Sequence, residues 1–185
     1  MTRYAGAPMA SIPPRFKVAL ISTGGTIEKT YDELHGVLDN RLSVLDAILA
    51  SLELEGVALT RVRLMNKDSL HMTEADHDLI AQTTEGMLHE HDGVVVVHGT
   101  DRLTKTGDRI YDLLKKDNRL TKPVVLTGAM RPYELRRTDS VQNLTEALLA
   151  VQVVQPGVYV AIHNQVLKFP GVKKDYDRMT FTRAD

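Results

Sequence analysis

Short polar side chains recur in this sequence where apolar runs end, and their types suit acyl transfer. A run of four valines from Val94 stops at His98-Gly-Thr-Asp101, which sets a hydroxyl beside a carboxylate. Three other apolar runs lead into Ser22-Thr-Gly-Gly-Thr26, Asn66-Lys-Asp-Ser69 and Thr127-Gly-Ala-Met-Arg-Pro132. A hydroxyl can act as a nucleophile, hydrogen-bond donors can stabilise an oxyanion, and a carboxylate can orient a charged substrate. The histidines and acidic residues show no metal-ligand spacing, so we expect no metal.

A hydroxyl nucleophile also needs a base, and a candidate lies near the C-terminus. Pro170-Gly171 is the pair favoured at the centre of a type II turn, and it separates Val166–Phe169 from Val172–Asp175. We therefore expect these two segments to pair as a hairpin. Side chains alternate between faces along a strand, so one of Lys173 and Lys174 can face the hydroxyls while the other faces water.

Strand-like and helix-like segments alternate along the chain. Segments rich in β-branched residues predict strands at Phe16–Ser22, Val57–Leu64, Val94–Val97, Val124–Thr127 and Val158–Ile162. Helical crossovers between parallel strands are right-handed and cover both faces of the sheet. We expect an α/β fold: one three-layer domain with a mostly parallel sheet, Rossmann-like or flavodoxin-like, and a C-terminal hairpin. The carboxyl ends of its strands share one edge, so Thr26, Ser69, Thr100 and Asp101 should converge there.

Four helical patterns separate the strands. The first two begin with the capping boxes Ser43-Val-Leu-Asp46 and Thr73-Glu-Ala-Asp76, in which side chains satisfy free N–H groups. The expected apolar faces are Leu45, Ile48, Leu49 and Leu52; Leu79, Ile80, Thr83, Met87 and Leu88; Ile110, Leu113 and Leu114; and Val141, Leu144, Leu148 and Val151.

Composition limits the classes of partner. The chain has 185 residues, with 23 Lys+Arg against 24 Asp+Glu and no cysteine. A net charge of −1 predicts no broad basic surface for nucleic acid or for a membrane, so a small polar substrate fits better. No apolar stretch has the length of a signal peptide core or a membrane span. We expect a cytoplasmic protein, a flexible tail over residues 1–15, one domain over residues 16–185, and a homodimer formed through helix faces.

At this point the motifs resemble a known family, the bacterial-type L-asparaginases and glutaminase-asparaginases. Thr23-Gly-Gly-Thr-Ile27 and Val97-His-Gly-Thr-Asp101 resemble its first and second signatures, and Thr127-Gly-Ala-Met-Arg-Pro132 a third characteristic stretch. Asp68-Ser69 resembles its substrate-binding serine turn, and Val172-Lys-Lys174 falls where the family carries its catalytic lysine. The matches occur in the family's order and spacing, from about Phe16 to Phe181, and Asp139 through Asn143 resembles the start of a family helix.

The resemblance implies an amidohydrolase that releases ammonia from the side-chain amide of L-asparagine, or of glutamine, through a Thr-linked acyl-enzyme and without a cofactor. It implies Thr26 as the nucleophile and Thr100, Asp101 and Lys174 as the groups that move protons. Ser69 and Asp101 would bind the α-carboxylate and the α-amino group of the substrate. The remaining expected site residues are Gly25, Asp68, Gly99 and Ala129 for substrate binding, and Tyr31 as the counterpart of a loop tyrosine that orients the nucleophile.

The sequence departs from the family pattern at several positions. Arg102 follows the second signature where a threonine is common, and Leu70 replaces a polar residue that helps to bind substrate in many members. Family members typically exceed 300 residues and have a second domain that supplies substrate-binding groups to a neighbouring subunit.

Two other readings stay open. Ser22-Thr-Gly-Gly-Thr-Ile-Glu28 also resembles the phosphate loop of flavodoxin-like FMN proteins, but Lys29 to Asn40 shows no amphipathic helix and the chain has no tryptophan to stack on a flavin. The chain could also be a non-catalytic domain of this fold, or the amide-hydrolysing part of a tRNA-dependent amidotransferase.

Overall fold

A central sheet organises the protein. The computed structural model describes residues 15–40 and 43–183, so the expected tail, apart from Arg15, lies outside the described residues. The six-stranded sheet has the order β4-β1-β5-β6-β7-β8, and all neighbours are parallel except β7 and β8. Its strands are β4 (Val57–Lys67), β1 (Phe16–Gly24), β5 (Gly93–Val97), β6 (Pro123–Thr127), β7 (Gly157–Ile162) and β8 (Gln165–Lys168).

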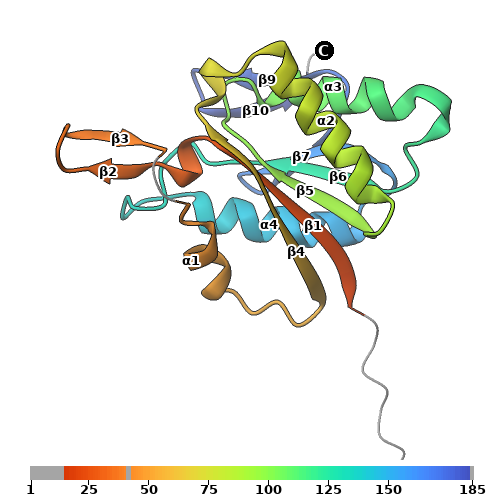
Figure 1. Cartoon of the computed structure of the whole chain (residues 1–185), viewed down its shortest axis with the longest axis horizontal. Helices are drawn as coiled ribbons and strands as arrows, with labels where there is room; N and C mark the ends of the chain where they lie inside the picture. The colour runs from red at the N-terminus through yellow and green to blue at the C-terminus, as the bar shows by residue number, and fades with distance from the viewer. Residues whose placement is uncertain (1–14, 41–42, 184–185) are drawn as a thin grey trace, which may run out of the picture.

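Helices cover both faces of this sheet, which confirms the predicted three-layer α/β domain. Figure 1 shows α2 (Glu74–Leu88) and α3 (Leu103–Lys115) above the sheet, and α1 (Leu45–Ala50) and α4 (Ser140–Val153) below it. Single 3₁₀ turns lie at η1 (Thr26–Glu28), η2 (Ser69–His71) and η3 (Lys116–Asn118). Two small antiparallel sheets complete the described fold: β2 (Thr30–Asp32) with β3 (Val37–Asp39), and β9 (Val172–Asp175) with β10 (Thr180–Arg183).

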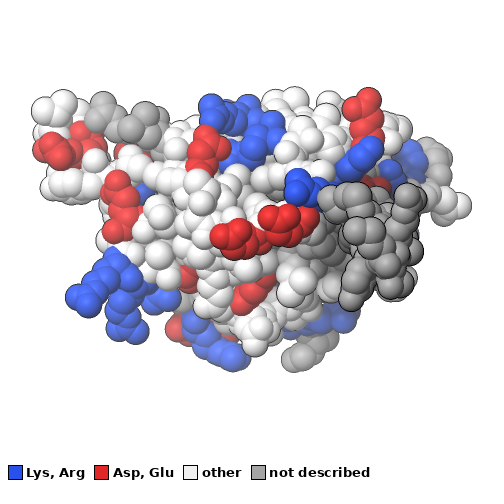
Figure 2. Space-filling view, turned by 90° about the horizontal axis from the view of Figure 1, so that it is seen from below, with Lys and Arg blue, Asp and Glu red and all other residues white. Residues whose placement is uncertain are grey.

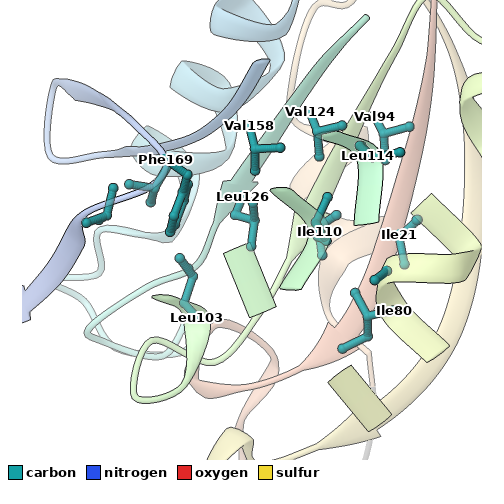
Figure 3. Packing of buried hydrophobic residues seen from close by; sticks show 14 of the residues in the cluster. Ile21, Ile80, Val94, Leu103, Ile110, Leu114, Val124, Leu126, Val158 and Phe169 are labelled. Atoms are coloured by element: carbon teal, nitrogen blue, oxygen red, sulfur yellow. The ribbon is translucent and has the colours of Figure 1, made fainter. Parts of the chain in front are cut away.

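Alternate side chains of the four central strands, β1, β5, β6 and β7, enter opposite cores. Along β1, Ala19 and Ile21 face α2 and α3, while Val18 and Leu20 face α1 and α4. All four are fully buried. Figure 3 shows the upper core, where helix residues such as Ile80, Leu103 and Ile110 interlock with strand residues and with Phe169. Burial on both faces explains why these four strands have continuous apolar runs rather than alternating patterns.

The predicted strands are confirmed, and β1 and β4 extend further than expected, to Gly24 and Lys67. The hairpin of β2 and β3 is an element that we did not predict. Its strands have three residues each, too few for a recognisable alternation. In Figure 1 it projects from the body of the domain.

Of the two predicted capping boxes, one is confirmed and one is wrong. The Thr73 hydroxyl accepts a hydrogen bond from the Asp76 N–H, and the Asp76 carboxylate accepts one from the Thr73 N–H. The first helix instead begins after Val44 without a side-chain cap, because the Ser43 hydroxyl donates to the carboxylate of Glu28. In α2, the expected core residue Leu79 is 45% exposed.

The C-terminal part contains antiparallel hairpins, but our assignment of their arms was wrong. Val166–Phe169 does not pair with Val172–Asp175: β8 pairs with β7, and β9 pairs with β10. His163 and Asn164 connect β7 to β8 with φ angles of 51° and 60°. Two consecutive residues with positive φ form a turn whose twist suits a two-residue hairpin, so β8 pairs with the strand directly before it.

Charges of both signs are mixed on one face of the molecule (Figure 2). On the face drawn in Figure 2, basic and acidic side chains alternate with uncharged ones, and no broad field of a single sign covers it. Within the described residues, no helix is long and apolar enough to span a membrane.

Candidate active site

Two glycines bring the ends of β1 and β5 into direct contact. Gly25 has φ of 85°, and a Cβ atom built there would lie 2.4 Å from both the Cα and the N of Gly99. The Gly25 N–H donates to the carbonyl of Lys67 at 3.0 Å, which fixes the turn to the end of β4 as well. Any side chain at position 25 would therefore separate the segments that carry Thr26 and Thr100.

The lysine predicted as the base lies against its expected partners. Lys174 Nζ lies 2.9 Å from Thr100 Oγ1 and 2.7 Å from Asp101 Oδ1, and its side chain is only 6% exposed. Lys173, on the opposite face of β9, is exposed. The structure thus brings the Lys174 amino group next to the Thr100 hydroxyl and the Asp101 carboxylate, which lie 74 and 73 positions earlier in the chain. Such a set can pass a proton to or from a reacting group.

Ser69 lies beside the same turn. Its side chain is 1% exposed, and its hydroxyl has no hydrogen-bond partner among the described residues. A Cβ atom at Gly99 would lie 2.6 Å from Ser69 Oγ, so the absence of a side chain at Gly99 leaves room for this hydroxyl. A buried unpaired hydroxyl is costly unless something binds it. Ser69 therefore fits a ligand contact.

Asp68 orients the Ser69 turn. Its carboxylate accepts a hydrogen bond from the Leu70 N–H at 3.0 Å and from Lys29 Nζ at 2.7 Å. Burial alone would raise the pKa of this carboxyl, but the hydrogen bonds from Lys29 and Leu70 outweigh that effect, so the pKa lies below its usual value. Leu70 itself is 54% exposed and offers no polar group.

Thr26, the expected nucleophile, is the half-buried first residue of η1. Two residues on, the buried Glu28 carboxylate accepts a hydrogen bond from the Gly24 N–H at 3.1 Å and another from the Ser43 hydroxyl. These bonds close the turn on which Thr26 sits. Burial, the largest influence, raises the pKa of Glu28. Sequence reasoning missed this role of Glu28.

His98 supports the other side of the site through contacts with α2 and α3. It is completely buried, as expected for a structural histidine, with Nδ1 2.8 Å from the Gly99 carbonyl and Nε2 2.8 Å from Thr106 Oγ1. A carbonyl only accepts, so Nδ1 carries the proton, the Thr106 hydroxyl donates to Nε2, and His77 Nδ1–H donates to that hydroxyl at 2.7 Å. Burial lowers the pKa of His98 to about 4.

A second network that sequence reasoning missed fixes the loop after β6. The buried Asp139 carboxylate accepts hydrogen bonds from the Met130 N–H at 3.0 Å, the Arg131 N–H at 2.9 Å, Asn143 Nδ2 at 2.8 Å and His163 Nε2 at 2.8 Å. Burial alone would raise the pKa of Asp139, but these bonds hold it below its usual value. The only sequence signal was the spacing of Asp139 and Asn143 by one helical turn.

That loop borders the site through Gly128. A Cβ atom there would lie 2.2 Å from the His98 carbonyl oxygen and 3.4 Å from Thr100 Cγ2. Ala129, an expected substrate-binding residue, is fully buried and its methyl group belongs to the lower core. Only its main chain can face a ligand.

Most of the expected site residues fall into two groups. In the first, Lys174 contacts both Thr100 and Asp101. In the second, Gly99 packs against both Gly25 and Ser69, and Thr26 and Asp68 are sequence neighbours of this set. Tyr31 stands apart: it lies on β2 of the projecting hairpin, is 58% exposed, and pairs across the hairpin with Leu38. In the described part of the chain, no group of three or more His, Cys, Asp or Glu side chains could hold a metal ion.

The sequence is similar to a known protein family and to individual known proteins. Residues 17–178 match the family described as "Asparaginase, N-terminal". The L-asparaginase of Thermococcus kodakarensis is 31% identical over 160 residues, which are 85% of this chain and 47% of that protein. A glutamyl-tRNA(Gln) amidotransferase subunit of Haloquadratum walsbyi is 35% identical over 148 residues, which are 79% of this chain and 33% of that protein.

Solved structures show the same similarity. The thermostable L-asparaginase from Thermococcus kodakarensis has a TM-score of 0.76 at 27% identity, over 91% of this chain and 51% of that one. A probable cytoplasmic L-asparaginase from Campylobacter jejuni has a TM-score of 0.68 at 26% identity, over 91% of this chain and 52% of that one. The chain spans about a third to a half of the length of these relatives.

Proposed function

Since the chain belongs to the asparaginase family, we propose that it is an amidohydrolase that releases ammonia from the side-chain amide of L-asparagine, or of a related small amide. The observation that carries the proposal is the contact of Lys174 Nζ with Thr100 Oγ1 and Asp101 Oδ1. A purely structural reading does not explain why a lysine from β9 is buried against a hydroxyl at the carboxyl edge of the sheet.

In the proposed reaction, Thr26 Oγ attacks the amide carbon of the substrate. The hydroxyl proton leaves through the Thr100–Lys174–Asp101 set, and a proton returns to the amide nitrogen, which departs as ammonia. A water molecule then attacks the resulting ester, with the same set accepting its proton, and releases the free acid and Thr26. Main-chain N–H groups at the glycine turns are the candidates to stabilise the oxyanion.

The substrate's head group has two candidate partners. The unpaired Ser69 hydroxyl can donate to an α-carboxylate, and the Asp101 carboxylate, with its side chain 29% exposed, can accept from an α-amino group. Asparagine and glutamine share this head group and differ by one methylene, which is worth only about 1–3 kcal/mol of discrimination. Tyr31 remains a proposed contributor that would have to approach as the hairpin moves.

Ammonia release from asparagine tests the proposal directly. Thr26→Ala should lower kcat by on the order of 10⁴-fold or more, because loss of one member of a cooperative nucleophilic set removes most of its effect. Thr30→Ala, four residues on and on the hairpin, is the matched control and should keep most of the activity. Trapping of the acyl-enzyme with hydroxylamine should yield a hydroxamate only from protein that has Thr26. Wild-type turnover by Thr26→Ala would refute the assignment.

A second candidate function rests on the similarity to the amidotransferase subunit. In that case the domain would hydrolyse an amide within a larger assembly, and free asparagine would be a poor substrate for the isolated chain. The same assay separates the two candidates.

Neither the family match nor the similar solved structures support the FMN-binding alternative, and a colourless purified protein would argue against it. Cytoplasmic localisation is likewise a proposal, supported by the similarity to the probable cytoplasmic L-asparaginase from Campylobacter jejuni.

A further inference from the structure

The strand β8 forms one edge of the main sheet. Within the described residues it pairs only with β7, and its residues are largely exposed. The Phe169 N–H donates to the Val158 carbonyl at 2.9 Å, so Phe169 directs its main chain toward β7. Main-chain direction alternates along an antiparallel strand, and the N–H and C=O groups of Val166 and Lys168 therefore point away from β7. They form an open hydrogen-bonding edge.

An apolar hollow adjoins this edge on the α4 side. Val166 is opposite Ala161, whose side chain belongs to the lower core, so Val166 faces α4. Val166 is 46% exposed, and Leu149 and Val153 on α4 are 61% and 68% exposed. These three side chains line a hollow of about 180 Å³. An open strand edge beside exposed aliphatic side chains is the kind of surface that proteins cover by association.

The two ends of this surface carry opposite charges, so two copies in antiparallel arrangement would be complementary. Near the start of β8, the Glu146 carboxylate accepts hydrogen bonds from the Asn164 N–H at 2.9 and 3.0 Å. At the other end, Lys168 Nζ lies 5.6 Å from the centre of the Tyr159 ring. Among the described residues, neither Glu146 nor Lys168 forms an ion pair. The surface thus carries an anion at one end and a cation at the other.

We propose that this surface is a homodimer interface in which β8 strands of two copies pair antiparallel about a twofold axis. Val166 of each copy lies opposite Lys168 of the other, so that all the outward main-chain groups of these residues bond across the axis. Lys168 then extends over the hollow toward Glu146 of the second copy, diagonally across the sheet. A twofold axis with antiparallel strands places the Lys168 end of one copy beside the Glu146 end of the other. The opposite charges then meet, so a second copy fits this surface better than an unrelated partner.

The oligomeric state of the protein tests this interface. Sedimentation equilibrium should give twice the chain mass of 20.6 kDa, with dissociation on dilution. Val166→Pro removes only an N–H that points outward, so pairing with β7 should survive while the dimer dissociation constant rises at least about tenfold. Leu149→Glu, which puts a charge into the hollow, should weaken the dimer to a similar extent. Leu79→Glu is the matched control, because Leu79 is similarly exposed but lies on α2, on the opposite face.

Three results would overturn the proposal: a monomer at every concentration, a dimer that both Val166→Pro and Leu149→Glu leave intact, or a dimer that Leu79→Glu disrupts instead. The last result would place the interface on helix faces above the sheet. Thermal melting of each variant shows whether it is folded, and Leu149→Glu, on the surface of a helix, provides the test if Val166→Pro does not fold. None of these residues belongs to the proposed active site, so the outcome is independent of ammonia release.

Discussion

Replacing Lys174 by methionine is the most informative test of the site, because Lys173 beside it provides a control. Methionine keeps the apolar stem and removes the amino group that touches Thr100 Oγ1 and Asp101 Oδ1 at 2.9 and 2.7 Å. A positioned group that transfers a proton contributes about 10²- to 10⁴-fold to a rate. We expect Lys174→Met to lower kcat by at least this factor, and Lys173→Met to lower it less than about threefold, since surface changes rarely matter.

The effect of Lys174→Met on stability should be smaller than its effect on catalysis. Breaking a fully buried ion pair costs about 3–5 kcal/mol, because the remaining charge has no water. The Asp101 side chain is 29% exposed and can regain hydration when its partner is lost. We therefore expect a loss of about 1–3 kcal/mol in the free energy of unfolding, close to the cost of an unsatisfied polar group. The variant should remain folded at assay temperature.

Ammonia release and thermal melting of the two variants, measured side by side, separate these effects. Activity in Lys174→Met above a tenth of wild type would refute the assigned role. A loss of activity in Lys173→Met equal to that in Lys174→Met would mean that the β9–β10 hairpin matters only as a scaffold. A melting temperature far below that of Lys173→Met, with activity lost in proportion to unfolding, would also contradict the reasoning.

Two further predictions concern the turns and the buried histidine. Gly25→Ala should abolish activity and destabilise the fold by several kcal/mol, because the new Cβ would meet main-chain atoms of Gly99 at 2.4 Å. Gly36→Ala is the control: Gly36 has a φ of 66°, but a Cβ there would have no neighbour closer than 4.0 Å. In thermal melting it should show only the milder cost of a positive φ. His98, whose pKa falls from 6.5 to about 4 on burial, contributes stability that is fully present above pH 6.5 and is lost as the pH falls toward about 4. The free energy of unfolding should decline over that window in wild type and less steeply in His98→Gln, and equal slopes would contradict the assignment.

The amino-acid sequence by itself determined the layers of the fold and the sheet edge that carries the candidate site. Val94–Val97 and the strand segments of β1, β6 and β7 are buried on both faces, so nearly every position in them requires an apolar residue, and such runs can be recognised in the linear sequence. The Thr73 box was predictable for a related reason, since a capping residue and its partner lie three positions apart. The motifs after each strand then placed Thr26, Ser69 and Thr100 at one edge.

Only the tertiary structure decided which groups meet when several partners compete. Ser43 had a local cap available but bonds Glu28 instead, and β8 pairs with β7 through the two-residue turn at His163 and Asn164 rather than with β9. The Asp139 carboxylate gathers donors up to 24 positions away, and Lys174 crosses 74 positions to reach Thr100. Hydrogen bonds and ion pairs depend on distance in space and not on periodicity along the chain, so a sequence pattern shows which groups need partners but not which partners they find.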